Sequence, residues 1–130
     1  MANWSELMTY IRSNYKISDE DKGYCRLLFD VGDGRSQFIL LFHQTLNGGL
    51  EDWVEIQSPV GNATDLPLLD VLKDVGRMVV GGLSVEENLA LLKHSVPLAN
   101  LDVNEFERPM RLLLHSADNL ERKYLGSDRL

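Results

Sequence analysis

Residues 24–46 read YCRLLFDVGDGRSQFILLFHQTL, two apolar runs on either side of Gly32-Asp33-Gly34-Arg35. An Asp-Gly pair favours a two-residue primed turn, because the central positions of that turn need positive φ. The stretch therefore predicts a β-hairpin in which Gly32 lies opposite Arg35. In this register the core face holds three opposed pairs: Phe29 with Phe38, Leu27 with Leu40, and Cys25 with Phe42.

The other face of the predicted hairpin is also largely apolar. It holds Leu28 opposite Ile39, Arg26 opposite Leu41, and Tyr24 opposite His43. An antiparallel sheet with one solvated face normally alternates between apolar and polar side chains. We therefore expect this second face to be covered, at least in part, by another segment of the chain or by another molecule.

A third strand is expected from Leu50 to Ser58, after the turn Asn47-Gly48-Gly49. A three-residue loop places Val54 and Ile56 in the core and Trp53 outside, beside His43. A two-residue loop reverses the faces, because side chains alternate along a strand. The three-residue loop is preferred, since it buries two β-branched side chains.

Apolar residues at helical spacing predict three helices, over 3–15, 66–78 and 102–125. Asn3 with Glu6, and Asp102 with Glu105, have the spacing of capping boxes. Pro109 leaves two possibilities for the last helix, because a proline inside a helix clashes with the preceding turn. The helix either begins near Arg108 or is kinked there.

Two more strands are expected over 79–86 and 89–96, with Gly81-Gly82 marking a bulge or a close backbone approach. The polar run 18–23 is expected to be a connection. The sequence thus predicts an α+β fold: a single domain over 1–130 with a five-stranded antiparallel twisted sheet and three helices. The predicted order is α-β-β-β-α-β-β-α.

The formal charge of −7 and the scattered basic residues argue against binding to nucleic acid or to anionic membranes. No secretory signal and no apolar run of 18 residues is present, which predicts a soluble, cytoplasmic protein. The only cysteine, Cys25, falls on the expected core face. His43, His94 and His115 are far apart and lack the spacing of metal ligands. We therefore expect no catalytic residue, metal or cofactor.

Residues 80–102 read VGGLSVEENLALLKHSVPLANLD: a glycine-bearing strand, a leucine-rich strand and a Pro97–Asp102 link to the closing helix. This pattern resembles the type III secretion chaperone-like fold, which the YbjN-like regulators share. The resemblance implies helices packed on a twisted antiparallel sheet, often in a homodimer, with no enzymatic activity. It also implies that an extended segment of a client protein is held against apolar patches and strand edges, and that the second helix forms the dimer contact through Leu68, Val71, Leu72 and Val75.

The sequence therefore favours a homodimeric protein-binding module, chaperone-like or regulatory. The expected client contact is the second sheet face, formed by Tyr24, Leu28, Ile39, Leu41, His43 and Trp53. One alternative is a small-ligand site on the same face, with His43 and Tyr24 as its polar groups. Another is a structural subunit of a larger complex.

Overall fold

The structure is a computed structural model that describes residues 1–126. Its helices are α1 (Trp4–Asn14), α2 (Leu68–Val75) and α3 (Val103–Leu125). Its strands are β1 (Ile17–Asp21), β2 (Tyr24–Gly32), β3 (Arg35–Leu46), β4 (Glu51–Asn62), β5 (Gly82–Glu86) and β6 (Leu89–Pro97). The predicted α+β class, with three helices and an antiparallel sheet, is confirmed.

The strands form one sheet in the order β1-β2-β3-β4-β6-β5, with each strand antiparallel to its neighbours. The prediction of five strands was wrong, because β1 forms from the polar run that was expected to be a connection. Asp19 and Asp21 pair with Arg26 and Tyr24 at the edge of the sheet. An edge strand is held by backbone hydrogen bonds on one side only and tolerates charge, so apolar alternation does not reveal it.

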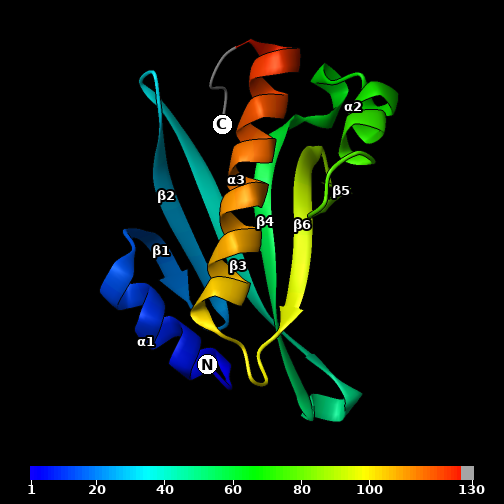
Figure 1. The fold of residues 1–130 in the computed structure, drawn as a ribbon. Coiled ribbons are helices and arrows are strands. Elements are labelled where there is room, and N and C mark those ends of the chain that lie inside the picture. The colour runs from blue at the N-terminus through cyan, green and yellow to red at the C-terminus, as the bar shows by residue number, and fades with distance from the viewer. Residues whose placement is uncertain (127–130) are drawn as a thin grey trace.

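The helices enclose the core against one face of the sheet. Figure 1 shows α3 lying across this face, with α1 near one end of the helix and α2 near the other. α3 packs on β3, β4 and β6. The centre of the core is fully buried and includes Ile11, Leu41, Ile56, Leu92 and Phe106.

The predicted register of the β2–β3 hairpin was wrong by one residue. Gly32 does lie opposite Arg35, but Asp30 pairs with Ser36, so Val31 is an extra residue in β2. The carboxylate of Asp30 accepts a hydrogen bond of 2.9 Å from the Gly32 amide, and Gly32 has a φ of +93°. Such a bulge shifts the pairing by one residue, so β2 keeps its predicted core face while the two faces of β3 are exchanged, because side chains alternate along a strand.

Beyond the bulge, the core face consists of Cys25, Leu27, Ile39 and Leu41, all fully buried. Three residues predicted for the core lie on the opposite face: Phe38, Leu40 and Phe42. The connection to β4 is also one residue longer than expected, since Leu46 pairs with Glu51. The two one-residue errors cancel in β4, where Val54 and Ile56 are in the core as predicted.

α3 begins at Val103, six residues before Pro109, so the expectation of a start near Arg108 was wrong. The Asp102 amide donates to the Glu105 carboxylate at 2.9 Å, which fits the predicted capping box. At α1, Asn3 Oδ1 accepts from the Glu6 amide, whereas the Glu6 carboxylate accepts from the amide of Ala2, not of Asn3. α3 ends at Leu125 and is followed by the capping residue Gly126, whose φ of +72° is left-handed.

Both elements around the predicted Gly81-Gly82 feature are shorter than expected. α2 covers only residues 68–75, and β5 starts at Gly82. Gly81 has a φ of +96°, and a Cβ there would lie 2.6 Å from Leu113 Cδ1 of α3. A close approach of the backbone to α3 therefore explains the glycine.

Candidate functional site

The face of the sheet opposite the helices is the candidate site, and we call it the outer face. The observed register places on it apolar side chains from four neighbouring strands: Tyr24, Leu28, Phe38, Leu40, Phe42, Trp53 and Leu91. Within residues 1–126, no helix has its main packing contacts on this side. Most of these side chains are half-buried by their neighbours in the sheet, whereas Leu91 is buried.

The aromatic and polar side chains of the outer face contact one another laterally. The rings of Tyr24 and Phe42 lie 5.0 Å apart. The guanidinium of Arg26 lies 4.8 Å from the centre of the Phe38 ring, and its Nε donates to Ser18 Oγ at 3.0 Å. These contacts link the side chains of the apolar centre to one another and to β1.

The other half of the outer face carries a row of ion pairs. Lys93 Nζ lies 3.3 Å from a Glu55 oxygen and 3.7 Å from a Glu86 oxygen. Gln57 Nε2 donates to the second oxygen of Glu55 at 2.6 Å. Glu55, Gln57 and Glu86, together with Leu40, Phe42 and Leu91, line an open hollow of about 450 Å³. Its lining suits a partner that is apolar at its centre and polar at its margin.

The predicted client-contact residues do not share a face. Tyr24, Leu28 and Trp53 lie on the outer face. Ile39 and Leu41 are fully buried in the core, so the expectation that they contact a partner fails in this conformation.

His43 lies on the helix side, where its ring stacks on Trp4 with a centroid distance of 5.4 Å. Its Nε2 is 2.9 Å from an oxygen of Asp52. The expected pairs of His43 with Tyr24 and with Trp53 are therefore wrong, since His43 lies opposite Val54 and Trp53 lies opposite Gln44. This removes the polar pair on which a small-ligand site was predicted.

The sequence reasoning missed Phe38, Leu40, Phe42 and Leu91. The signal that identifies the first three is Asp30, two residues before Gly32, because this side chain can accept from the Gly32 amide and support a bulge. For Leu91, the run Ala90-Leu91-Leu92 is apolar on both faces of β6, so alternation gives no sign of its direction.

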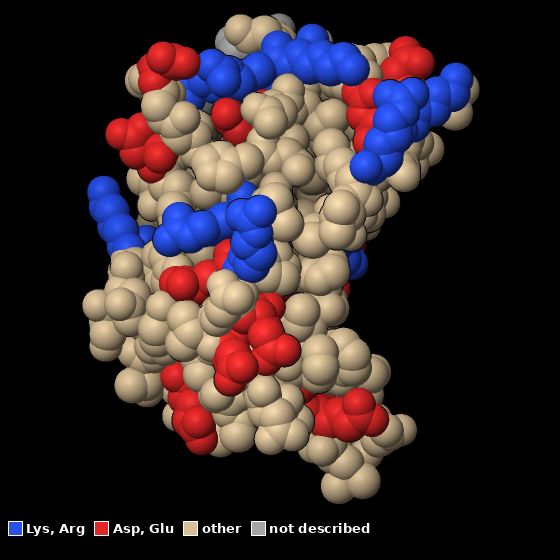
Figure 2. Space-filling model, viewed as in Figure 1, with Lys and Arg blue, Asp and Glu red and all other residues tan. Residues whose placement is uncertain are grey.

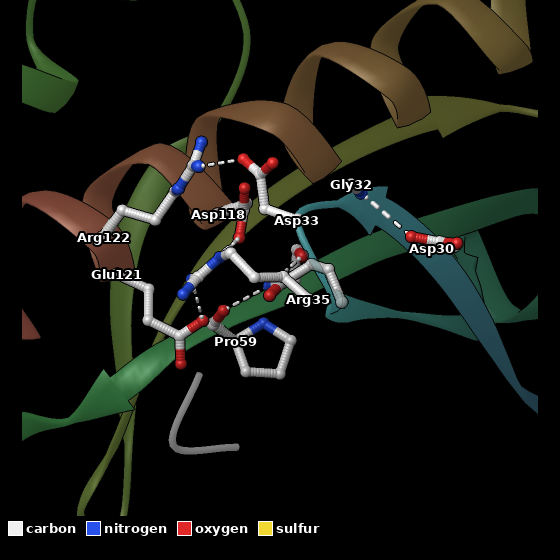
Figure 3. Close-up of polar contacts among 10 residues, drawn as sticks. Asp30, Gly32, Asp33, Arg35, Pro59, Asp118, Glu121 and Arg122 are labelled. Atoms are coloured by element: carbon white, nitrogen blue, oxygen red, sulfur yellow. Dashed lines mark hydrogen bonds and ion pairs between the residues drawn. The ribbon is translucent and has the colours of Figure 1, made fainter. Parts of the chain in front are cut away.

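A buried ionic cluster ties the tip of the β2–β3 hairpin to α3 (Figure 3). Arg35 Nε and Nη2 donate to Asp118 Oδ1 at 3.1 and 3.0 Å, and Nη2 also donates to Glu121 Oε1 at 3.1 Å. The exposed fractions of these three side chains are 12%, 5% and 1%. At the surface beside them, Arg122 donates to Asp33 at 2.9 Å. The cluster lies on the helix side, where it fastens α3 against the sheet.

A second polar contact joins the N-terminal helix to α3. Glu107 accepts a hydrogen bond of 2.8 Å from the Tyr10 hydroxyl and another from the Tyr15 hydroxyl. The bond from Tyr15, followed by that from Tyr10, lowers the pKa of the Glu107 carboxyl below its ordinary value. Like the Arg35 cluster, this contact holds a helix on the core side.

The reactive groups considered from the sequence are the thiol of Cys25 and the possible metal ligands. Cys25 is fully buried, and burial raises the pKa of its thiol to about 11. A thiol in this state is protonated near neutral pH and is a poor nucleophile. In the described part of the chain, no three His, Cys, Asp or Glu side chains come together as metal ligands would.

The predicted dimer contact is divided between the core and the surface. Val71 is fully buried and Val75 is nearly so, whereas Leu72 is 50% exposed. Leu69, which the sequence reasoning did not include, is 67% exposed, and Val79 beyond the helix is 95% exposed. Next to Val79, a groove of about 370 Å³ is lined mainly by Met78, Val80 and Leu112.

Across residues 1–126, no helix has both the length and the apolar character needed to cross a membrane. No protein-family model matches this chain, and no curated protein matches it.

Proposed function

We propose that this protein is a non-enzymatic binding module for another protein, chaperone-like or regulatory, that works in the cytoplasm as a homodimer. The observation that supports this proposal is the outer face, an apolar sheet surface left without a helix in the described residues. Soluble proteins rarely leave a large contiguous apolar patch exposed unless something binds there.

The size of the outer face agrees with this role. The four inner strands contain nine to twelve residues each. At about 3.3 Å per residue and about 4.8 Å between strands, the six strands present roughly 800 Å², similar to the area that one partner contributes to a standard interface. An interface of this area is large enough for specific binding.

The dimer is proposed at α2. Leu69 and Leu72 point away from the core, and Val79 extends the apolar surface toward the groove beside α3. Helices that bury such residues against a second copy form isologous contacts. This arrangement keeps the outer face free for the client.

The experiment that tests the binding role compares two leucine-to-aspartate variants. Leu40→Asp places a charge in the centre of the outer face, whereas Leu50→Asp changes a residue that is 88% exposed in the β3–β4 turn. Tagged forms are used to capture proteins from the native host, and their melting temperatures are compared first. We expect a stoichiometric partner that Leu50→Asp retains and Leu40→Asp loses. A partner retained by both variants, or found with neither variant nor the unchanged protein, contradicts the proposal.

A further inference from the structure

The charges on the outer face are strongly unbalanced. Of the side chains in residues 1–126 that the strand register places there, six are carboxylates: Asp19, Asp21, Asp30, Glu51, Glu55 and Glu86. Two are cations, Arg26 and Lys93. Six against two leaves a formal charge of −4 on this face, more than half of the −7 of the whole chain.

Both cations already have partners within the face. Arg26 is held between Ser18 and the Phe38 ring. Lys93 lies between Glu55 and Glu86. An incoming molecule therefore meets the remaining carboxylates with little positive charge available to it.

A group of basic residues lies on the opposite side of the molecule. Figure 2, viewed from the helix side, shows lysine and arginine side chains over the upper part of α3 and over α2. They include Lys73, Arg77, Arg122 and Lys123. The rest of the chain carries the remaining −3, so negative charge is most concentrated on the outer face.

A second copy of the chain is a poor occupant of the outer face. Two outer faces packed together oppose −4 with −4, and like charges brought together at an interface are costly. Arg26 and Lys93, the two cations of each face, already contact groups of their own face. Ion pairs between the two copies therefore do not offset the repulsion. A partner with the opposite charge at its margins removes the penalty.

From the charge and the apolar centre together, we propose that the outer face binds a segment of a partner protein with an apolar stripe flanked by lysine and arginine. The stripe packs on Leu40 and Phe42, and the basic side chains reach the carboxylates at the two margins, Asp19 and Asp21 on β1 and Glu86 on β5. This inference rests on the proposed protein-binding function and adds the chemistry of the partner.

The test uses two synthetic peptides that share an apolar stripe of alternating leucines. One has lysine and the other glutamate at the flanking positions. Binding to the full-length protein is measured by fluorescence anisotropy in 50 mM and 500 mM salt. We expect the lysine peptide to bind at least about tenfold more tightly than the glutamate peptide, with the difference shrinking at high salt because exposed charges are screened.

A pair of charge reversals locates the effect. Glu86 is 59% exposed at the margin of the outer face, and Glu86→Lys changes the charge there by two units. Asp70→Lys makes the same change on the exposed surface of α2 and serves as the matched control. We expect Glu86→Lys to weaken binding of the lysine peptide about threefold to tenfold, and Asp70→Lys to leave it within about twofold.

The other outcomes separate this inference from the proposed function. Equal binding of both peptides, abolished by Leu40→Asp, overturns the charge inference and leaves the protein-binding role standing. Failure of the lysine peptide to bind overturns the inference, while partner capture still decides the broader role. Self-association that Leu40→Asp abolishes makes the outer face a contact between copies and overturns the inference as well.

Discussion

At the scale of single residues, Arg35 is the side chain that joins the β2–β3 hairpin to α3 through buried ion pairs. It neutralises two carboxylates on α3, Asp118 and Glu121, both almost completely buried. Removing one partner of a buried ion pair leaves a charge without its counter-ion in a medium that solvates it poorly.

Arg35→Met should lower the free energy of unfolding by about 3–5 kcal/mol, the range for breaking a buried pair. Arg122→Met removes the pair with Asp33, which is largely exposed, and should cost at most about 1 kcal/mol. Urea denaturation of both variants measures the difference. Equal losses for the two variants would contradict the assignment of Arg35 as the anchor of α3.

Glu107 makes the stability depend on pH. Its folded-state pKa is lowered from the ordinary value of 4.5, chiefly by the hydrogen bond from Tyr15. A carboxyl with a depressed pKa contributes stability above its unfolded pKa and loses it as the pH falls toward the folded value. The free energy of unfolding should therefore fall below about pH 4.5, and Glu107→Gln should make that fall shallower. An unchanged slope in this variant would contradict the assignment.

Gly81 is required by its conformation and by its neighbour. Gly81→Ala combines a φ of +96° with a Cβ position 2.6 Å from Leu113 Cδ1, whereas a Cβ at the adjacent Gly82 has nothing within 4 Å. We expect Gly81→Ala to destabilise the protein by about 1–3 kcal/mol and Gly82→Ala to cost much less. Thermal unfolding of the two variants checks this. A larger loss for Gly82→Ala would show that the link before β5 is held differently.

At the scale of elements, α2 is the helix with the fewest buried residues. Only one side of this helix is buried, through Val71 and Val75, while Leu69 and Leu72 are exposed. If α2 forms the dimer contact, Leu72→Asp should convert the dimer to a monomer, and Leu50→Asp should not. Light scattering after size-exclusion chromatography measures the mass. A dimer that survives Leu72→Asp, or a monomer for the unchanged protein, contradicts the dimer assignment.

The sequence predicted the helices and the core of β4 because their apolar residues recur at regular spacing. Leu113 and Leu120 in α3, and Val54 and Ile56 in β4, are buried as expected. It did not predict β1, since an edge strand such as residues 17–21 needs no apolar alternation. The bounds of the short helix α2 were also not predicted: it begins after Pro67, two residues later than the expected start at residue 66.

The sequence predicted three residues of the outer face, Tyr24, Leu28 and Trp53, and the error in the others comes from the bulge at Val31. The extra residue Val31 shifts the pairing of β2 with β3 and sends Ile39 and Leu41 into the core, while Leu40 and Phe42 move to the outer face. Apolar side chains occur at both parities in 38–42, so the composition of the strand cannot choose between the registers. That both faces of the hairpin are apolar was predictable, and this feature led to the binding proposal.

At the scale of the whole molecule, the protein has two unlike sides. The helix side is closed by α3 and fastened by the Arg35 cluster and by Glu107. The outer side is an apolar, acidic sheet face without a covering helix among residues 1–126. A sheet held in place by its helices is suited to binding, because few of its side chains and loops have to become ordered when a partner binds.

The most direct test of this account is site-specific photo-crosslinking in the native host. A photoreactive phenylalanine analogue is placed at Phe42, on the outer face, and in a second strain at the exposed His115 on the helix side. We expect one defined crosslink to another protein from position 42 and none to that protein from position 115. A crosslink to the same protein from position 115 alone, or no crosslink from position 42, would contradict the claim that the outer face is the binding surface.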